Sequence, residues 1–456
     1  IVAFHTMSTS NAGGEFALFR KSRFRRQWSR SPRGATMGGA PPGPMGRRYL
    51  KMYLSGMTHR DRLFDVATRW LADRLEPEDG HVLTEIFAFE RAITAPMVRR
   101  FVADLCRTCH RGDLYMERIS CKDQVRDAIV AAAAHPSTRV AELIDWYRQL
   151  PEEFFPRTPV RMSLVTLPNG KLTAIVRRKR IRRIADKVSR RIAEQLTGEI
   201  DAVSRLLAAS RPKARSGIDR EIAPPSTPAA VGGAAERLVA DRIRSGRITL
   251  DPEKNRVDDV IGVKVIGTAA ELETIESALD NLEYTFASHR EVHAGTYEGI
   301  HYLVDLELPD NEVILANMAG IDWSFAAGRG LRVERLDESF NAYIQSCRRT
   351  FRVELILTSF DDLVESEFGL SIHEQRILEQ RDLAADFGRI ARNASSIIEY
   401  MLRLATSPTV DIDHIPIKIW GRYIRDTLNS AIAELGGGEP TEWLVPEEHL
   451  EDLMQL

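Results

Sequence analysis

The residues with the clearest chemical potential are an aromatic ring and an imidazole four positions apart, Tyr297 and His301. An aspartate, Asp259, opens an apolar segment earlier in the chain, and a glutamate, Glu354, lies in a later one. An aromatic ring can stack on a nucleobase, and two carboxylates can hold Mg²⁺ against phosphate oxygens. Together these residue types predict a site for a nucleotide and its metal ion.

A strongly basic stretch, residues 177–191, could supply the positive charge that such a site needs. It contains nine Lys or Arg side chains and one Asp. In phosphoryl-type transfer, cationic side chains neutralise the charge that spreads over the transferring group. We therefore interpret Arg177 and Lys179 as phosphate contacts. The alternative interpretations of this stretch are a solvated helix face and a helix that contacts RNA.

Strands are predicted to position the acids and the imidazole. Asp259–Ile266 is an apolar segment of strand length. Residues 300–308 and 351–357 alternate apolar and polar side chains, as strands with one buried face do. This alternation places His301 and Glu354 on the polar faces of their strands.

A hairpin is predicted immediately before the basic stretch. Val160–Leu167 and Lys171–Val176 flank Pro168-Asn169-Gly170, and an Asn-Gly pair is a strong hairpin signal. The second strand of this hairpin runs directly into residues 177–191. We expect that basic stretch to be a helix or to begin one.

Helical periodicity surrounds this strand-containing part and divides the chain. We expect a helical region over 49–158, an α+β domain over 159–375 with an insertion over 192–256, and a C-terminal helical region over 376–456. Residues 1–48 have little apolar periodicity, and we expect them to be disordered or non-native.

The amino-acid composition limits the classes of protein to which this chain could belong. Of 456 residues, 43% are apolar and 28% are charged, which is typical of a globular protein, and the formal net charge is −2. No run approaches the roughly 20 apolar residues of a membrane span, so no membrane partner is expected. Four cysteines in this length indicate a reducing compartment, and we expect a cytoplasmic protein.

One cysteine motif needs separate interpretation. Cys106, Cys109 and His110 have the spacing of a haem-attachment motif, and with Cys121 they could form a zinc site. We interpret these residues as structural side chains of a helix and its surroundings, and we assign no metal to them.

The order of the motifs resembles the synthetase domain of the RelA/SpoT family, the nucleotide pyrophosphokinases that make (p)ppGpp alarmones. The resemblance covers about residues 160–191 and 257–375. The matching segments are Arg177, Lys179 and Lys187 for the family's Arg and two Lys; Asp259–Lys264 for Asp-x-x-Gly-x-Arg, with Lys264 in place of Arg; Tyr297–His301 for Tyr-x-x-Leu-His; and, in part, Glu354–Ser359 for Glu-Ile-Gln-Ile-Arg-Thr.

The resemblance implies a nucleotidyltransferase-like mixed β-sheet with helices, and it implies which residues bind the substrates. Arg177, Lys179 and Lys187 would bind the phosphates of ATP. Lys264 would contribute to substrate binding, and Tyr297 would stack on the guanine of the acceptor.

The resemblance also implies the catalytic residues. Asp259 and Glu354 would hold Mg²⁺, and Glu354 would help to deprotonate the attacking hydroxyl. His301 would contact acceptor or donor phosphates.

The implied reaction is attack of the 3′-hydroxyl of GDP or GTP on the β-phosphorus of ATP, which transfers pyrophosphate and releases AMP. Two alternatives stay open. One is a toxin-like enzyme that pyrophosphorylates the 3′ end of tRNA. The other is a degenerate module that binds a nucleotide or a protein without catalysis. The oligomeric state is also open, with a homo-oligomer among the options.

Overall fold

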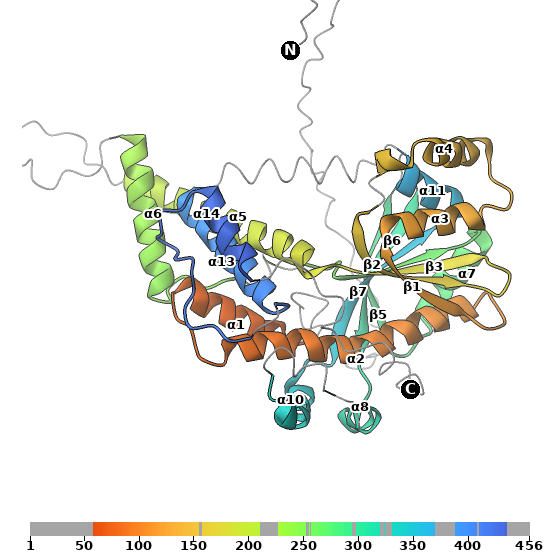
Figure 1. Cartoon of the computed structure of the whole chain (residues 1–456), viewed down its shortest axis with the longest axis horizontal. Helices are drawn as coiled ribbons and strands as arrows, with labels where there is room; N and C mark the ends of the chain where they lie inside the picture. The colour runs from red at the N-terminus through yellow and green to blue at the C-terminus, as the bar shows by residue number, and fades with distance from the viewer. Residues whose placement is uncertain are drawn as a thin grey trace, which may run out of the picture. The chain divides into compact units, whose positions relative to one another are not determined.

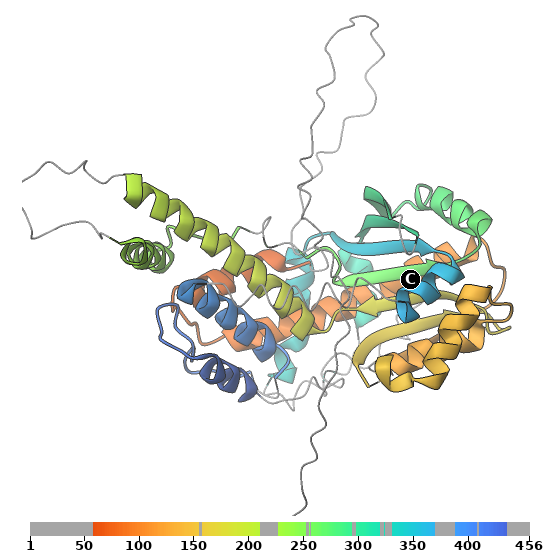
Figure 2. The same cartoon turned by 90° about the horizontal axis from the view of Figure 1, so that it is seen from above.

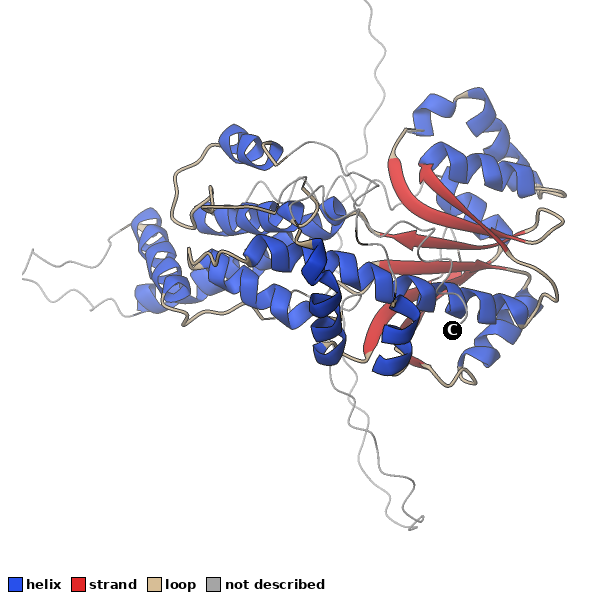
Figure 3. Ribbon diagram, turned by 60° about the horizontal axis from the view of Figure 1, so that its bottom comes forward, coloured by secondary structure: helices blue, strands red, loops and turns tan. Residues whose placement is uncertain are grey.

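A mixed β-sheet lies on one side of the described structure, next to a group of helices (Figure 3). The computed structural model describes residues 58–154, 157–209, 227–251, 255, 257–293, 298–319, 323, 331–369, 388–407 and 410–435. Its seven strands have the order β1-β2-β3-β4-β7-β6-β5. They are β1 (Tyr115–Cys121), β2 (Pro159–Thr166), β3 (Leu172–Arg178), β4 (Ile261–Ile266), β5 (Thr285–His293), β6 (Gly299–Glu307) and β7 (Thr350–Thr358). The neighbours β4 and β7 run parallel, and the other neighbouring pairs are antiparallel. The predicted α+β class is confirmed.

One face of the sheet is apolar and packs against α2 (Asp79–Arg107) and α7 (Ala269–Leu279) (Figure 1). Its strands supply alternate apolar residues, for example Val263 on β4 and Val353 on β7, both fully buried. This face belongs to a large core that continues into the helices next to the sheet.

The opposite face of the sheet is divided into an apolar and a polar part. Over β2 to β4 it packs against α3 (Lys122–Ala132), α4 (Thr138–Gln149) and α11 (Phe360–Phe368) in a second core, with the 3-10 turn Pro151–Phe154 at its rim. Over β7 and β6 the same face carries polar side chains at alternate positions. Because successive side chains of a strand point to opposite faces, the sheet has one apolar face and, on its other face, a polar region over β7 and β6.

The remaining helices form a second group around two long elements. Helix α5 (Ile181–Ala209) lies side by side with α13 (Arg389–Leu404) and also contacts α6 (Pro228–Arg244) (Figure 2). The others are α1 (Arg60–Leu71), α8 (Asn311–Met318), α10 (Val333–Ser346) and α14 (Arg425–Ala433). Among the described residues, no helix has both the length and the apolar character needed to cross a lipid bilayer.

One local signal behaves as the sequence predicts, and a second motif caps a helix. The β2–β3 hairpin turns at Gly170, whose φ of +81° favours glycine, and Asn169 Oδ1 accepts a hydrogen bond from the main-chain N–H of Lys171 at 3.1 Å. Thr268 and Glu271 form a capping box at the start of α7.

Other expectations need correction. The region 49–158 is not wholly helical, because it contains β1, which adds an edge strand to the sheet. Within the segment 192–256, α5 continues from the basic stretch to Ala209 and α6 follows from Pro228. Strand β4 begins two residues after Asp259. Residues 1–48, 376–387 and 436–456, for which the sequence gives predictions, lie outside the described residues.

Candidate functional site

Two residues of the predicted site, Arg177 and Glu354, lie in one row across the sheet, with Gly262 between them. Arg177 on β3 is paired with Gly262 on β4, and Gly262 is paired with Glu354 on β7. Paired residues point to the same face, so the guanidinium and the carboxylate meet over the glycine, with Arg177 Nη2 3.5 Å from Glu354 Oε2. A Cβ atom at Gly262 would lie 3.5 Å from that oxygen and 3.6 Å from that nitrogen. A side chain at position 262 would therefore be in van der Waals contact with both members of this pair.

Asp259, just before β4, is held by two ammonium groups. Its carboxylate forms ion pairs with Lys179 and, at 2.6 Å, with Lys187. Lys179 Nζ also donates to the main-chain oxygen of Asp259 at 2.8 Å. Burial alone would raise the pKa of Asp259, but the two lysines outweigh it and hold that pKa well below its usual range. Asp259 is therefore ionised at neutral pH.

Arg177 connects this cluster with Glu354. Burial lowers the pKa of Lys179 to about 8, and the positive charge of Arg177 is the next cause of that shift. Arg177 also contacts Glu354, so the two carboxylates belong to one electrostatic group. Lys179 remains mostly cationic at neutral pH, because its lowered pKa still exceeds 7.

His301 lies on β6, in the next row of the same face. Its partner in the register is Ile356, and its Nδ1 is 3.9 Å from Glu354 Oε1. Burial, together with the nearby His293 and Lys264, lowers the pKa of His301 to about 4. The imidazole is therefore neutral at neutral pH. Its buried Nε2 has no hydrogen-bond partner among the described residues, which leaves that atom available to a ligand.

Lys264 and Tyr297 are the two other residues predicted to contact the substrate. The ammonium group of Lys264 donates to Ser366 Oγ of α11 at 3.2 Å, and burial lowers the pKa of Lys264. Glu367 is the acidic side chain with the largest effect on that pKa. Lys264 is thus held against α11. Tyr297 lies outside the described residues.

A second polar network, which sequence reasoning did not assign to the site, occupies the row on the other side of Glu354. Arg352 binds Asp305 through two hydrogen bonds of 2.7 and 2.9 Å and Asp258 through one of 3.1 Å. Alternation along β6 and β7 places Asp305 and Arg352 on the polar face. The contact with Asp258 joins segments far apart in the sequence, and no local pattern signals it.

The donors at the site fit Mg²⁺ only in combination with a substrate. Within the described part of the chain, no three or more His, Cys, Asp or Glu side chains come together as a metal cage. Mg²⁺ commonly uses one or two carboxylates plus substrate phosphates and water. Asp259 and Glu354 could supply such carboxylates, and cationic side chains face both of them at present. This donor set fits a metal that arrives with phosphates, and it does not fit a metal held by protein alone.

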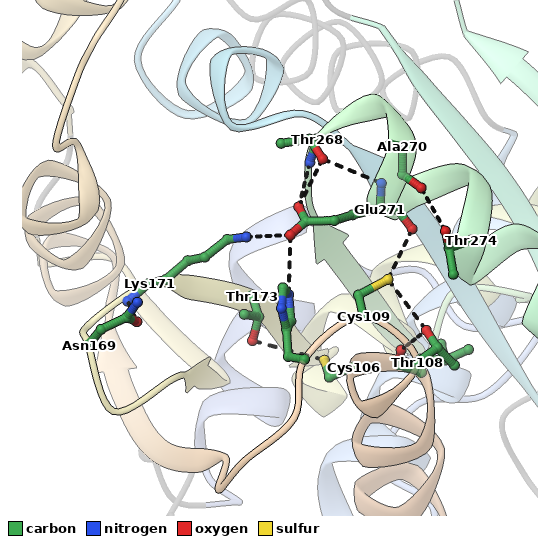
Figure 4. A network of polar contacts seen from close by, with 12 residues as sticks. Cys106, Thr108, Cys109, Asn169, Lys171, Thr173, Thr268, Ala270, Glu271 and Thr274 are labelled. Carbon is green, nitrogen blue, oxygen red and sulfur yellow. Dashed lines mark hydrogen bonds and ion pairs between the residues drawn. The ribbon is translucent and has the colours of Figure 1, made fainter.

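The two cysteines of the Cys106–His110 motif contact different partners. Figure 4 shows Cys106 directed toward Thr173 and Cys109 directed toward α7. Cys106 Sγ lies 3.9 Å from Thr173 Oγ1, and Cys109 Sγ lies 3.3 Å from the main-chain oxygen of Glu271. Burial raises the pKa of Cys106 to about 11, so its thiol stays protonated. These contacts show two thiols with separate partners.

Three cationic side chains surround the two predicted carboxylates. Those of Arg177, Lys179 and Lys187 outnumber those of Asp259 and Glu354. An excess of positive charge around two partly buried carboxylates suits a substrate that carries phosphates. Comparisons with protein-family models, with curated proteins and with solved structures find no match for this chain.

Proposed function

We propose that this site transfers pyrophosphate from ATP to the 3′-hydroxyl of GDP or GTP, on a nucleotidyltransferase-like sheet. The observation that carries the proposal is the row Arg177–Gly262–Glu354, with the Asp259 cluster joined to it through Arg177. Two carboxylates and three cationic side chains from separated segments of the chain are thereby linked through Arg177. This is the charge pattern that phosphoryl-type transfer requires.

In this proposal the cationic residues bind and orient ATP. Arg177 has the planar fork that suits two phosphate oxygens, whereas Lys179 and Lys187 act as point charges. Asp259 holds both lysines on one side of the site through its ion pairs. Mg²⁺, held by Asp259 and Glu354 together with phosphate oxygens, would neutralise charge on the transferring group.

In this proposal Glu354 and His301 contact the acceptor nucleotide. Glu354 Oε1 faces the imidazole, and its other oxygen faces Arg177, which together fix its orientation. Glu354 accepts the proton of the attacking 3′-hydroxyl. His301 is neutral, so its buried Nε2 can contact an acceptor hydroxyl or phosphate without adding charge.

The test is transfer of label from ATP carrying ³²P in its β- and γ-phosphates, with Mg²⁺ and either GDP or GTP. We expect the wild-type protein to label the guanine nucleotide and to release AMP. Asp259→Asn and Glu354→Gln should each reduce the rate by at least about 100-fold, the usual contribution of a positioned acid or base. Asp280→Asn, on an exposed residue at the end of α7, is the matched control and should retain the wild-type rate.

Two results would contradict the proposal. One is a wild-type protein that labels no acceptor although it binds ATP, which would favour the non-catalytic module. The other is a wild-type rate in both carboxylate variants, which would remove Asp259 and Glu354 from the reaction.

A second acceptor, the 3′ end of tRNA, is favoured by the start of α5. Several arginines lie there next to the site, among them Arg182, whose side chain is exposed. Such a helix could contact an RNA backbone. Labelling of tRNA in place of GDP and GTP, with a rate that falls steeply as salt rises, would identify this acceptor.

A further inference from the structure

Arg352 on β7 connects the segments that carry the two carboxylates of the candidate site. It lies two residues before Glu354 on the same strand, so both side chains point to the polar face of the sheet. Its Nη1 donates a hydrogen bond to Asp258 Oδ1 at 3.1 Å. Asp258 directly precedes Asp259 in the chain. The arginine therefore ties the turn that carries Asp259 to the strand that carries Glu354.

The other two nitrogens of Arg352 fix the orientation of its guanidinium group. Nε and Nη2 donate to the two carboxylate oxygens of Asp305 at 2.7 and 2.9 Å. Asp305 lies on β6 and is paired with Arg352 in the register of the two strands. Because a planar guanidinium that is bound on two sides keeps one orientation, it can hold Asp258 at a defined distance from β7.

The turn before β4 is held from the β3 side as well. Lys179, which follows β3, donates its main-chain N–H to the carbonyl oxygen of Val260 at 2.8 Å. Its ammonium group donates to the carbonyl oxygen of Asp259, also at 2.8 Å. Strands β3 and β7 are the two neighbours of β4 in the sheet. Lys179 and Arg352 thus hold residues 258–260 from opposite sides.

The separation between Asp259 and Glu354 decides whether one cation can bind to both. Mg²⁺ takes oxygen ligands at about 2.0–2.1 Å in a nearly ideal octahedron, so it tolerates little change in their positions. A displacement of about 1 Å can reduce the rate of a catalytic site about 100-fold. Lysine side chains are flexible and can follow a phosphate group over such a distance. The contact between Arg352 and Asp258 should therefore affect cation binding more than phosphate binding.

We propose that Arg352 is a positioning residue, which sets the separation of Asp259 and Glu354 and thereby the affinity of the site for a divalent cation bound together with nucleotide phosphates. This inference rests on the proposed function, because it takes both carboxylates as ligands of one cation. All three nitrogens of the guanidinium group donate to protein carboxylates. Arg352 therefore acts through Asp258 and leaves phosphate binding to other side chains.

The probe that tests this role is Mn²⁺ with α,β-methylene-ATP, an analogue that cannot be cleaved between its α- and β-phosphorus. Mn²⁺ is titrated into the full chain and the analogue, and its binding is followed by electron paramagnetic resonance. Asp258→Ala removes the contact between Arg352 and the turn. We expect this variant to bind Mn²⁺ at least about tenfold more weakly than the wild type, whereas its affinity for the analogue without metal should change less than about twofold. A merely structural role of Arg352 would not separate the two affinities.

Two further variants serve as comparisons. Asp258→Asn keeps an oxygen that accepts the hydrogen bond from Arg352, so its affinity for Mn²⁺ should stay within about threefold of that of the wild type. Arg69→Gln is the matched control for the loss of an ion pair, since Arg69 of α1 binds the buried Asp79 of α2 at 2.7 Å. It should bind Mn²⁺ like the wild type.

Wild-type affinity for Mn²⁺ in folded Asp258→Ala would overturn the proposal. So would an equal loss in Asp258→Asn and Asp258→Ala, which would identify an effect of charge alone. If circular dichroism shows that Asp258→Ala does not fold, Arg352→Lys decides the outcome, because lysine keeps the charge but lacks the planar fork that reaches both carboxylates. We expect that variant also to bind Mn²⁺ at least about tenfold more weakly, and wild-type affinity there would overturn the proposal.

The transfer assay separates this inference from the proposed function. A wild-type protein that labels no acceptor, together with the expected loss of Mn²⁺ affinity in Asp258→Ala, would contradict the transfer reaction and leave the role of Arg352 standing. A wild-type protein that labels its acceptor but binds no Mn²⁺ with the analogue would overturn the role of Arg352 and leave the transfer reaction standing.

Discussion

The imidazole of His301 is the residue whose ionisation has the clearest consequence for stability. Burial lowers its pKa to about 4, while the unfolded chain has the ordinary value near 6.5. Between those values the unfolded state binds the proton more readily, so the free energy of unfolding decreases as the pH falls from about 6.5 to about 4. At pH 5 the loss amounts to about 2 kcal/mol.

Urea denaturation at pH 7 and pH 5 measures this effect. The wild-type protein should lose about 2 kcal/mol more between these two values than His301→Gln does, since glutamine does not titrate. His289→Gln, on an exposed residue of β5, is the control and should behave like wild type. An equal pH dependence in His301→Gln and wild type would show that His301 keeps an ordinary pKa.

At the scale of elements, Arg352 joins three segments. It binds Asp305 on the neighbouring strand β6 and Asp258 before β4, and it is 7% exposed. Removing one partner of a buried ion pair leaves the other charge uncompensated, at a cost of about 3–5 kcal/mol. We expect Arg352→Met to destabilise the protein by about that amount, measured by urea denaturation at pH 7.

The control for this prediction is an exposed ion pair. Arg148 and Asp145 lie three residues apart on α4, 3.4 Å from each other. We expect Arg148→Met to change stability by less than about 0.5 kcal/mol, as is usual for surface pairs. A similar small effect for Arg352→Met would mean that its network contributes no net stability.

Elements with strong local signals could be predicted from the sequence. The Asn-Gly turn fixes the β2–β3 hairpin, and alternation identifies β6 and β7, because one face of each is buried in the core. Strand β5 has no such pattern. It lies at the edge of the sheet, and most of its side chains are exposed. Strand β1, at the other edge of the sheet, is also mostly exposed, so no alternation in its sequence predicts it.

The sequence predicts which residues belong to the site, but it does not predict how their side chains pair. Alternation and motif order predict that Glu354 and His301 share a face, and the structure brings them together. The pairing of Lys187 with Asp259, and of Lys264 with Ser366, depends on how α5 and α11 pack. Side-chain partners of this kind depend on tertiary packing, for which local periodicity carries no information.

At the scale of the whole molecule, one core joins the sheet with the helices around α5. It extends from α1 through the apolar face of the sheet to α14 without a break. Within it, Ile398 of α13 is fully buried and lies near Ile184 and Val188 of α5. The two parts of the chain should therefore unfold together.

Ile398→Asp tests this coupling. A buried, unpaired carboxylate should destabilise the protein by at least about 3 kcal/mol, and the shared core should carry that loss into the sheet. We expect faster hydrogen exchange at the amides of β4 as well as those of α13. Arg392→Ala, on the exposed side of α13, is the control. Acceleration confined to α13 would show that the sheet is stable independently of the helices.

Strand β3 ends in two adjacent arginines that point to opposite faces of the sheet, Arg177 toward Glu354 and Arg178 toward Thr94 of α2. Adding or deleting one residue before Arg177 would exchange the faces to which the two side chains point and disturb both contacts at once. A point substitution of either arginine removes one contact and keeps the other, so the two contacts can change independently by substitution but not by insertion or deletion.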